Sequence, residues 1–250
     1  MRLFRPLCLR GLLAALFLLC ASATGPTSDN PASLYQAVAI VTGTVEPERS
    51  RGFAAALEEV LVKVSGDISL AGSSSLAELA DKAGDFASSY HYRDRMAGIP
   101  VHDEQGTRER PHFLTVNFAP EKIDAVLRGL GREPWTERPV VWLRVEVDNG
   151  ISSFLLAHDA AFGQGQRAAL MEVAKRYGLP IRLPDGVSAA EPMLAGHLTW
   201  RPETLDWSSR WRLAAEGKTR EWEISATSFD AVFRAALGET VSLLAGRKRK

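Results

Sequence analysis

The first 23 residues constrain this chain most strongly, because they decide which part of it folds and in which compartment. Three arginines precede an apolar run of ten residues, GLLAALFLLC, and the small residues Ala21-Ser22-Ala23 follow it. This order is typical of a secretory signal peptide with its cleavage site. The run is too short for a membrane-spanning helix, which needs about 20 apolar residues, so a retained N-terminal anchor is the weaker alternative.

Cleavage after Ala23 removes both cysteines of the chain, Cys8 and Cys20. The remaining chain has no disulfide to stabilise it in an oxidising compartment, so it depends on a packed hydrophobic core. The whole chain balances 30 basic against 30 acidic residues, and the leader carries three basic residues and no acidic one. The body is therefore slightly acidic, which argues against a nucleic-acid binder. We expect a soluble exported protein, periplasmic in a bacterium.

Composition divides the rest of the chain into segments. Residues 24–33 are rich in Pro, Ser and Asn and indicate a flexible leader, and residues 131–139 hold two prolines without an apolar period, which indicates a linker. We predict an N-terminal α+β domain over 34–130 and a C-terminal α+β domain over 140–246, each a mostly antiparallel sheet covered by helices. Residues 247–250 form a basic tail.

The predicted N-terminal domain begins with a strand over 34–45 and continues with a helix from Pro47 to a terminating glycine, Gly66. Ser75 and Glu78 predict a capping box for a short second helix. Further predicted elements are strands over 86–93 and 111–118, which could pair as a long hairpin, and a helix over 120–130 that Gly131 ends.

The predicted C-terminal domain begins with an alternating strand over 140–147, and the turn Asp148-Asn149-Gly150 indicates a hairpin with 152–157. A helix over 164–177 ends at Gly178. The expected elements after it are a short strand over 181–183, a strand over 193–200 and a last helix over 229–244, for which Thr227 and Asp230 predict a capping box.

Residues 207–214 and 219–226 predict a hairpin that turns at Glu216-Gly217. In that register three cross-strand pairs form: Trp211 with Trp222, Arg212 with Glu221, and Arg210 with Glu223. The tryptophans of this region are expected to pack under the last helix, since aromatic residues at strand period usually face a core. Exposed tryptophans that stack on sugars or grip a peptide are the alternative.

Three stretches of the chain resemble one bacterial family: Gly52–Asp67, Tyr92–Pro111 and Trp207–Leu237. The polar segment VHDEQGTR at 101–108 carries most of the specificity. The sequence is similar to the uncharacterised family numbered 2066 among the domains of unknown function. This resemblance implies an exported bacterial protein and transfers no catalytic residues.

The densest polar group lies in the predicted hairpin between the two strands of the first domain. We interpret it as a loop that binds a partner protein, because functional loops are often polar and ordered. Two alternatives remain open: a hairpin tip whose arginines pair with its own carboxylates, and a metal site completed by His91 and His112. The candidate binding residues are Arg93, Asp94, Arg95, His102, Asp103, Glu104 and Arg108.

No local motif predicts a reaction. The G-x-G-x-x-A run at 163–168 does not directly follow a strand, so we expect no nucleotide and no other cofactor. The chain has no G-x-S-x-G and no H-E-x-x-H sequence. The leading hypothesis is a non-enzymatic periplasmic binding or envelope-assembly factor whose partner is an envelope protein or cell-wall component. A hydrolase that acts on a glycan or peptide bond in the envelope is the competing hypothesis.

Overall fold

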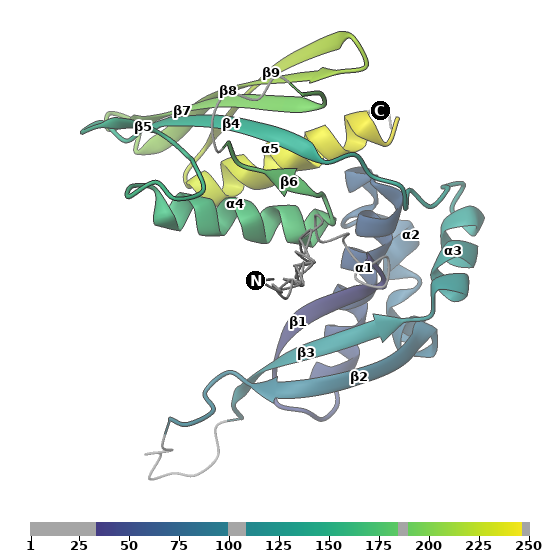
Figure 1. Cartoon of the computed structure of the whole chain (residues 1–250). Coiled ribbons are helices and arrows are strands. Elements are labelled where there is room, and N and C mark those ends of the chain that lie inside the picture. Colours follow the sequence, from purple (N-terminus) through teal and green to yellow (C-terminus); the bar gives the residue numbers. More distant parts are fainter. Residues whose placement is uncertain (1–33, 100–108, 185–189, 247–250) are drawn as a thin grey trace, which may run out of the picture.

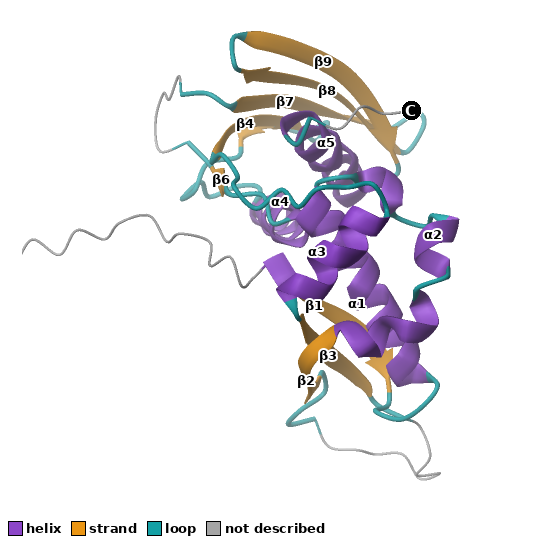
Figure 2. Ribbon diagram, turned by 90° about the vertical axis from the view of Figure 1, so that its right-hand side faces the viewer, coloured by secondary structure: helices purple, strands orange, loops and turns teal. Residues whose placement is uncertain are grey.

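Two β-sheets at opposite ends of the molecule, with helices between them, make up the structure (Figures 1 and 2). This computed structural model describes residues 34–99, 109–184 and 190–246. Its strands are β1 (Gln36–Thr42), β2 (Ala87–Asp94), β3 (Pro111–Phe118), β4 (Val141–Asp148), β5 (Ser153–Leu155), β6 (Ile181–Arg182), β7 (Met193–Arg201), β8 (Asp206–Ala215) and β9 (Lys218–Ala226). Its helices are α1 (Glu48–Ser65), α2 (Ser74–Ala77), α3 (Pro120–Gly129), α4 (Gln164–Tyr177) and α5 (Phe229–Leu244), with 3₁₀ helices at Ile68–Leu70 and Ala80–Phe86.

The strand pairing confirms the predicted α+β class with mostly antiparallel sheets. The first sheet has the order β1-β3-β2 and is antiparallel throughout. The second has the order β5-β4-β7-β8-β9, and in it β4 pairs in parallel with β7 and, on its other side, with the short β6. The hairpin predicted between the strands at 86–93 and 111–118 is present as the pair β2 and β3.

Each sheet builds its own hydrophobic cluster. The first cluster draws its buried residues from Leu34 to Leu127 and the second from Val141 to Val241, and the side chain of Tyr177 packs against both. The segment 131–139 runs between the two clusters, where the linker was expected. The division of the chain into two domains at these boundaries stays a prediction.

Helix α1 covers one face of the first sheet. In β1 the side chains of Ala37, Ala39 and Val41 are buried on that face, and those of Val38 and Ile40 are 42% and 60% exposed on the other. This is the alternation that a strand with one covered face shows. The helix ends at Gly66, whose φ of +67° and N–H bond to the Val62 carbonyl make the predicted glycine stop.

The predicted hairpin of the second sheet has the expected register. Trp211 lies opposite Trp222, and the turn residues Glu216 and Gly217 have φ values of 52° and 67°. Positive φ at both positions belongs to the tight hairpin turn whose twist matches that of the strands. The two expected charge pairs also form, at 2.6 Å between Arg212 and Glu221 and at 3.1 Å between Arg210 and Glu223.

The tryptophans of the second sheet contribute to its core, as expected. Trp211 is fully buried with its ring 6.3 Å from that of Phe233, and Trp207 lies 6.2 Å from Phe229. Both phenylalanines belong to α5, so the last helix covers this end of the sheet. Trp200 and Trp222 are half-buried beside them.

Both predicted capping boxes are wrong. Helix α2 begins after Ser73 and lasts a single turn, so Glu78 lies at its C-terminal end instead of in its first turn. Helix α5 begins after Ser228, whose Oγ accepts the N–H of Ala231 at 3.2 Å. That bond makes Ser228 the capping residue and shifts the helix start one residue beyond the predicted box.

A glycine in β7 makes room for the buried Trp211. The two residues are cross-strand partners, and a Cβ on Gly196 would lie 2.4 Å from the nearest atom of the indole ring. The ring therefore lies across the backbone of β7, which only glycine permits. The indole N–H donates to Ser209 Oγ at 3.0 Å, which fixes the ring in that position.

Gly196→Ala is expected to destabilise the protein by about 1–3 kcal/mol, because the buried Trp211 ring has to shift in a packed core. Urea unfolding followed by tryptophan fluorescence measures the change. The control is Ala195→Ser, one residue away on the uncovered face of the same sheet. Equal stability of the two variants would contradict this account of the glycine.

Candidate functional site

The structure brings together two of the predicted binding residues on the uncovered face of the first sheet. The guanidinium carbon of Arg93 lies 4.4 Å from the centre of the Phe113 ring, and that of Arg95 lies 5.1 Å from it. Cations are attracted to an aromatic face at such distances. Two exposed positive charges are thereby held above one half-buried ring.

Asp94 lies on the opposite face and is engaged within the hairpin. Its carboxylate accepts the backbone N–H of Met96 at 2.7 Å and the guanidinium of Arg110 at 2.8 Å, and these bonds lower its pKa. Arg110 also donates to the Ile99 carbonyl at 2.7 Å. This pair matches the alternative in which arginines and carboxylates of the hairpin satisfy each other. His102, Asp103, Glu104 and Arg108 lie outside the described residues.

The two histidines of the proposed metal site cannot share an ion. His91 pairs with Thr115 on the uncovered face of the sheet, and His112 lies beside the Tyr92 ring on the covered face. The sheet backbone separates their imidazoles. Among residues 34–99, 109–184 and 190–246, no three His, Cys, Asp or Glu side chains come close enough together to hold a metal.

A groove of about 1,140 Å³, which sequence reasoning missed, runs beside the first sheet. One wall is β1 with the adjoining side of α1, and the other is α4 with the N-terminal part of α5. Charged side chains line both walls. They are Glu48, Arg51, Glu59, Lys63, Arg93, Glu172, Lys175, Arg176, Asp230 and Arg234, a net of two positive charges.

Strand β1 presents an unpaired backbone edge to this groove. Within the described part of the chain it pairs with β3 alone. The N–H of Gly43 donates to the Arg110 carbonyl of the β3 side at 2.9 Å. In an antiparallel ladder the N–H and carbonyl of one residue point to the same side, and this side alternates from residue to residue. Since Gly43 faces β3, the backbone groups of Val38 and Ile40 point away from β3. The Gln36 carbonyl shows the same direction, since it accepts Lys63 Nζ at 2.7 Å.

The other long edge strands, β2 and β9, have features that hinder pairing with a further strand, and β1 lacks them. The pairing of β2 is interrupted by an irregularity between Ala87 and Ser89, and the strand ends in charged residues. The edge strand β9 carries charges at several positions (Lys218, Arg220, Glu221 and Glu223). Strand β1 reads QAVAIVT, with no charge and no proline, and its register is regular. Natural proteins usually block exposed edges with such features, so a bare edge is suited to pairing with another strand.

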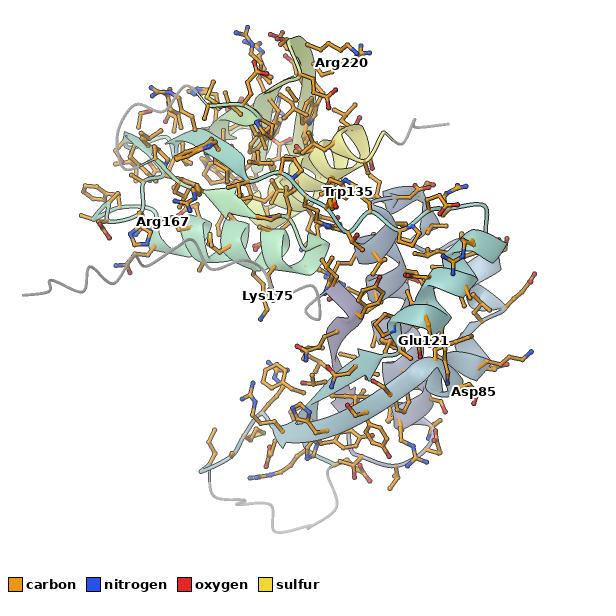
Figure 3. All side chains as sticks on the ribbon, turned by 45° about the vertical axis from the view of Figure 1, so that its right-hand side comes forward. Asp85, Glu121, Trp135, Arg167, Lys175 and Arg220 are labelled. Atoms are coloured by element: carbon orange, nitrogen blue, oxygen red, sulfur yellow. The ribbon has the colours of Figure 1, made fainter. Side chains whose placement is uncertain are left out.

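The opposite wall of the groove is built from small residues and from charged ones. Gly165, Ala168 and Ala169 contribute little side-chain volume along α4, and Glu172 and Lys175 follow on the same helix. Figure 3 shows Lys175 on the side of α4 that faces the first sheet. The small residues leave the space between α4 and β1 open.

The guanidinium of Arg138 joins the two walls. It donates to the Tyr177 and Gly178 carbonyls at the end of α4, at 2.6 and 3.0 Å, and to the Lys63 carbonyl of α1. It also lies 4.4 Å from the centre of the Trp135 ring. The segment expected to be the linker between two domains is therefore fastened to both halves of the molecule.

The residues around the Arg138 hydrogen bonds are closely packed. A Cβ on Gly178 would lie 2.6 Å from the Leu34 side chain, and a Cβ on Gly66 would lie 2.7 Å from Ala245 of the segment that follows α5. Lys63 is 5% exposed, and burial lowers its pKa. Its ammonium is compensated by Glu59 at 3.6 Å as well as by the β1 carbonyl.

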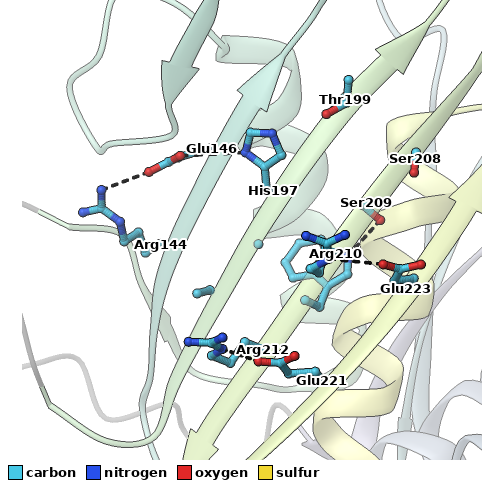
Figure 4. A pocket seen from close by; sticks show the side chains of 13 residues that line it. Arg144, Glu146, His197, Thr199, Ser208, Ser209, Arg210, Arg212, Glu221 and Glu223 are labelled. Atoms are coloured by element: carbon cyan, nitrogen blue, oxygen red, sulfur yellow. Dashed lines mark hydrogen bonds and ion pairs between the residues drawn. The ribbon is translucent and has the colours of Figure 1, made fainter.

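A second, shallower cavity of about 380 Å³ lies on the uncovered face of the second sheet (Figure 4). Its glutamates all have arginine partners: Glu146 with Arg144 at 2.9 Å, Glu221 with Arg212 and Glu223 with Arg210. His197 is half-exposed, 3.8 Å from Glu146. This face is a ladder of ion pairs, and an antiparallel sheet with one covered face commonly exposes such polar residues.

The glycine run at 163–168 begins α4 after a loop, with Gly163 at a φ of +77°. The strand before it, β5, ends at Leu155 and belongs to a hairpin with β4. A dinucleotide site requires a strand that leads directly into the first glycine of a parallel unit. The geometry around this run differs from that arrangement.

Comparison with known proteins connects the first part of the chain to an uncharacterised domain family. Residues 30–136 match the family model "Domain of unknown function (DUF8605)". The expectation of an uncharacterised family is supported at this level, and the match is to a family other than number 2066. The matched residues include the first sheet, α1 and α3.

The other comparisons add little. No curated protein matches the sequence. One solved structure, titled "Crystal structure of uncharacterized protein", aligns at 10% identity and a TM-score of 0.23, over 44% of this chain and 94% of its own. In the part of the chain that the structure describes, no helix has the length and apolar character to cross a membrane.

Arg138→Met is expected to destabilise the protein by about 2–4 kcal/mol, because it leaves partly buried carbonyls of both halves without their charged donor. Urea unfolding measures the loss. The control is Arg144→Met, which removes an exposed ion pair and should change stability by less than about 0.5 kcal/mol. If both variants lose the same small amount, Arg138 does not hold the two halves together.

Proposed function

We propose that this chain is exported to the bacterial periplasm and there binds another envelope protein, without catalysing a reaction. The signal-like leader supports export. The uncovered side of the first sheet supports binding, and it lies within the residues that match the domain family. The resemblance to the family numbered 2066, which implies an exported bacterial protein, is also part of this proposal.

One observation carries the binding proposal: an apolar strip with cations beside it on the first sheet. Ile40 and Val38 are exposed at 60% and 42%, and Ile40 lies opposite Phe113 in the register. Arg93 and Arg95 stand over that ring. Exposed apolar residues with a polar rim mark interaction sites, and arginines and aromatic residues are the side chains enriched there.

An envelope protein accounts for this strip better than a cell-wall glycan does. Glycan rings stack on exposed aromatic faces. Here the Phe113 ring is half-buried with two guanidinium groups above it, and the strip beside it consists of aliphatic side chains. Aliphatic and arginine side chains together favour contacts with protein.

Fractionation and in-cell crosslinking test the proposal. The mature chain should be found in the periplasm, beginning at Thr24, and a photocrosslinker at position 91 or 113 should form adducts with an envelope protein. Substituting Arg93→Glu together with Arg95→Glu should reduce the adduct at least tenfold, since this removes the cations beside the strip. The matched control, Lys218→Glu with Arg220→Glu, makes the same charge change on exposed β9 and should leave the adduct unchanged.

Two results would contradict the proposal. One is an uncleaved or cytoplasmic chain that forms no adducts from the first sheet. The other is hydrolysis of a glycan or peptide by the purified chain that is lost in His197→Gln, which would establish the competing envelope hydrolase.

A further inference from the structure

The edge of β1 indicates how the partner is held. Building on the proposed function, we propose that the partner inserts one extended, net-acidic segment into the groove, where it pairs with β1 as a fourth strand of the first sheet. The first sheet would then run in the order partner-β1-β3-β2. Such strand addition is a known mode by which proteins recognise extended peptides.

The backbone of β1 offers the hydrogen-bonding groups in the correct spacing. Val38 and Ile40 each direct one N–H and one carbonyl toward the groove, as the bonds of Gly43 and Gln36 establish. Residues two apart in a strand repeat this arrangement along one edge, which is the spacing at which an antiparallel neighbour forms its paired bonds. Four backbone hydrogen bonds are therefore available over three residues of β1.

The groove has walls on both sides, which suits a single inserted segment better than a second copy of the chain. Helix α4 and the N-terminal part of α5 line the groove opposite β1. A second copy that paired through its own β1 would bring its α1 and its remaining strands into the space that α4 occupies. One extended segment needs less room, and Gly165 and Ala168 contribute little side-chain volume on that helix.

The charges that line the groove favour an acidic segment. Glu48 is engaged by Arg51 at 2.5 Å, and Glu59 by both Lys63 and Arg176, at 3.6 and 3.2 Å. No carboxylate of the described residues forms an ion pair with Lys175, Arg234 or Arg93. Glu172 and Asp230 also line the groove, and no ion pair of the described residues includes them, so the lining as a whole keeps a net positive charge. The three exposed cations can pair with acidic side chains of the segment, whereas Val38 and Ile40 can pair with β-branched or aromatic ones.

A photocrosslinker at Thr42 of the full chain, expressed in its native cells, tests the inference. Thr42 is an exposed residue at the end of the same edge. The expected product is an adduct to one contiguous, net-acidic segment of an envelope protein, mapped by mass spectrometry. Adducts to a second copy of the chain, or to its own residues 24–33, would overturn the inference.

Substitution of the outward backbone donor tests strand pairing itself. Ile40→Pro removes an N–H that points away from β3, so the β3 ladder is kept, and it should reduce the Thr42 adduct at least tenfold. Ile40→Thr keeps the donor and changes only the side chain, so its adduct should stay well above that of Ile40→Pro. Val38→Glu, which places a negative charge beside the acidic segment and leaves the backbone intact, should also reduce the adduct, and circular dichroism confirms folding of each variant.

The pattern of failure separates this inference from the proposed function. Adducts from positions 91 and 113 that persist in Ile40→Pro and in Val38→Glu would keep the binding proposal and overturn strand addition. The absence of adducts from every position on the first sheet would overturn both.

Discussion

One guanidinium holds the two halves of this molecule in a fixed relation. Arg138 donates to carbonyls at the end of α1 and at the end of α4, and it rests on the ring of Trp135. Charged donors give stronger hydrogen bonds than neutral ones, and helix C-termini are where backbone carbonyls lack partners. Because both helix ends meet at this side chain, the wall formed by α4 stays opposite the edge of β1, and the groove keeps its shape.

The same period-two pattern of β1 produces both the core of the first half and its unpaired edge. Small and branched residues on one face, Ala37, Ala39 and Val41, let α1 pack closely. The alternate residues, Val38 and Ile40, expose their side chains and direct their backbone groups outward. A strand placed at the centre of the sheet would have used these groups internally. The edge position of β1 is therefore what makes the strand available to a partner.

Local patterns predicted much of the fold and little of the candidate site. The register of Trp211 opposite Trp222 and the glycine stops at Gly66 and Gly178 follow from alternation and from backbone freedom, which the sequence displays directly. The groove depends on the strand order β1-β3-β2 and on packing between distant helices, which no local pattern encodes. Successive residues of a strand point to opposite faces of the sheet, so the sequence alone could have predicted that Arg93 and Arg95 lie on one face and Asp94 on the other.

Amide hydrogen exchange along β1 tests the central claim, that this strand carries a free edge, most directly. In the chain without partner, the amides of Val38 and Ile40 should exchange on the order of 100-fold faster than those of Ala37, Ala39 and Val41, which bond to β3. That alternation would establish an edge open to an incoming strand. Equal protection at all five positions would show that the edge is already paired, and would contradict the account.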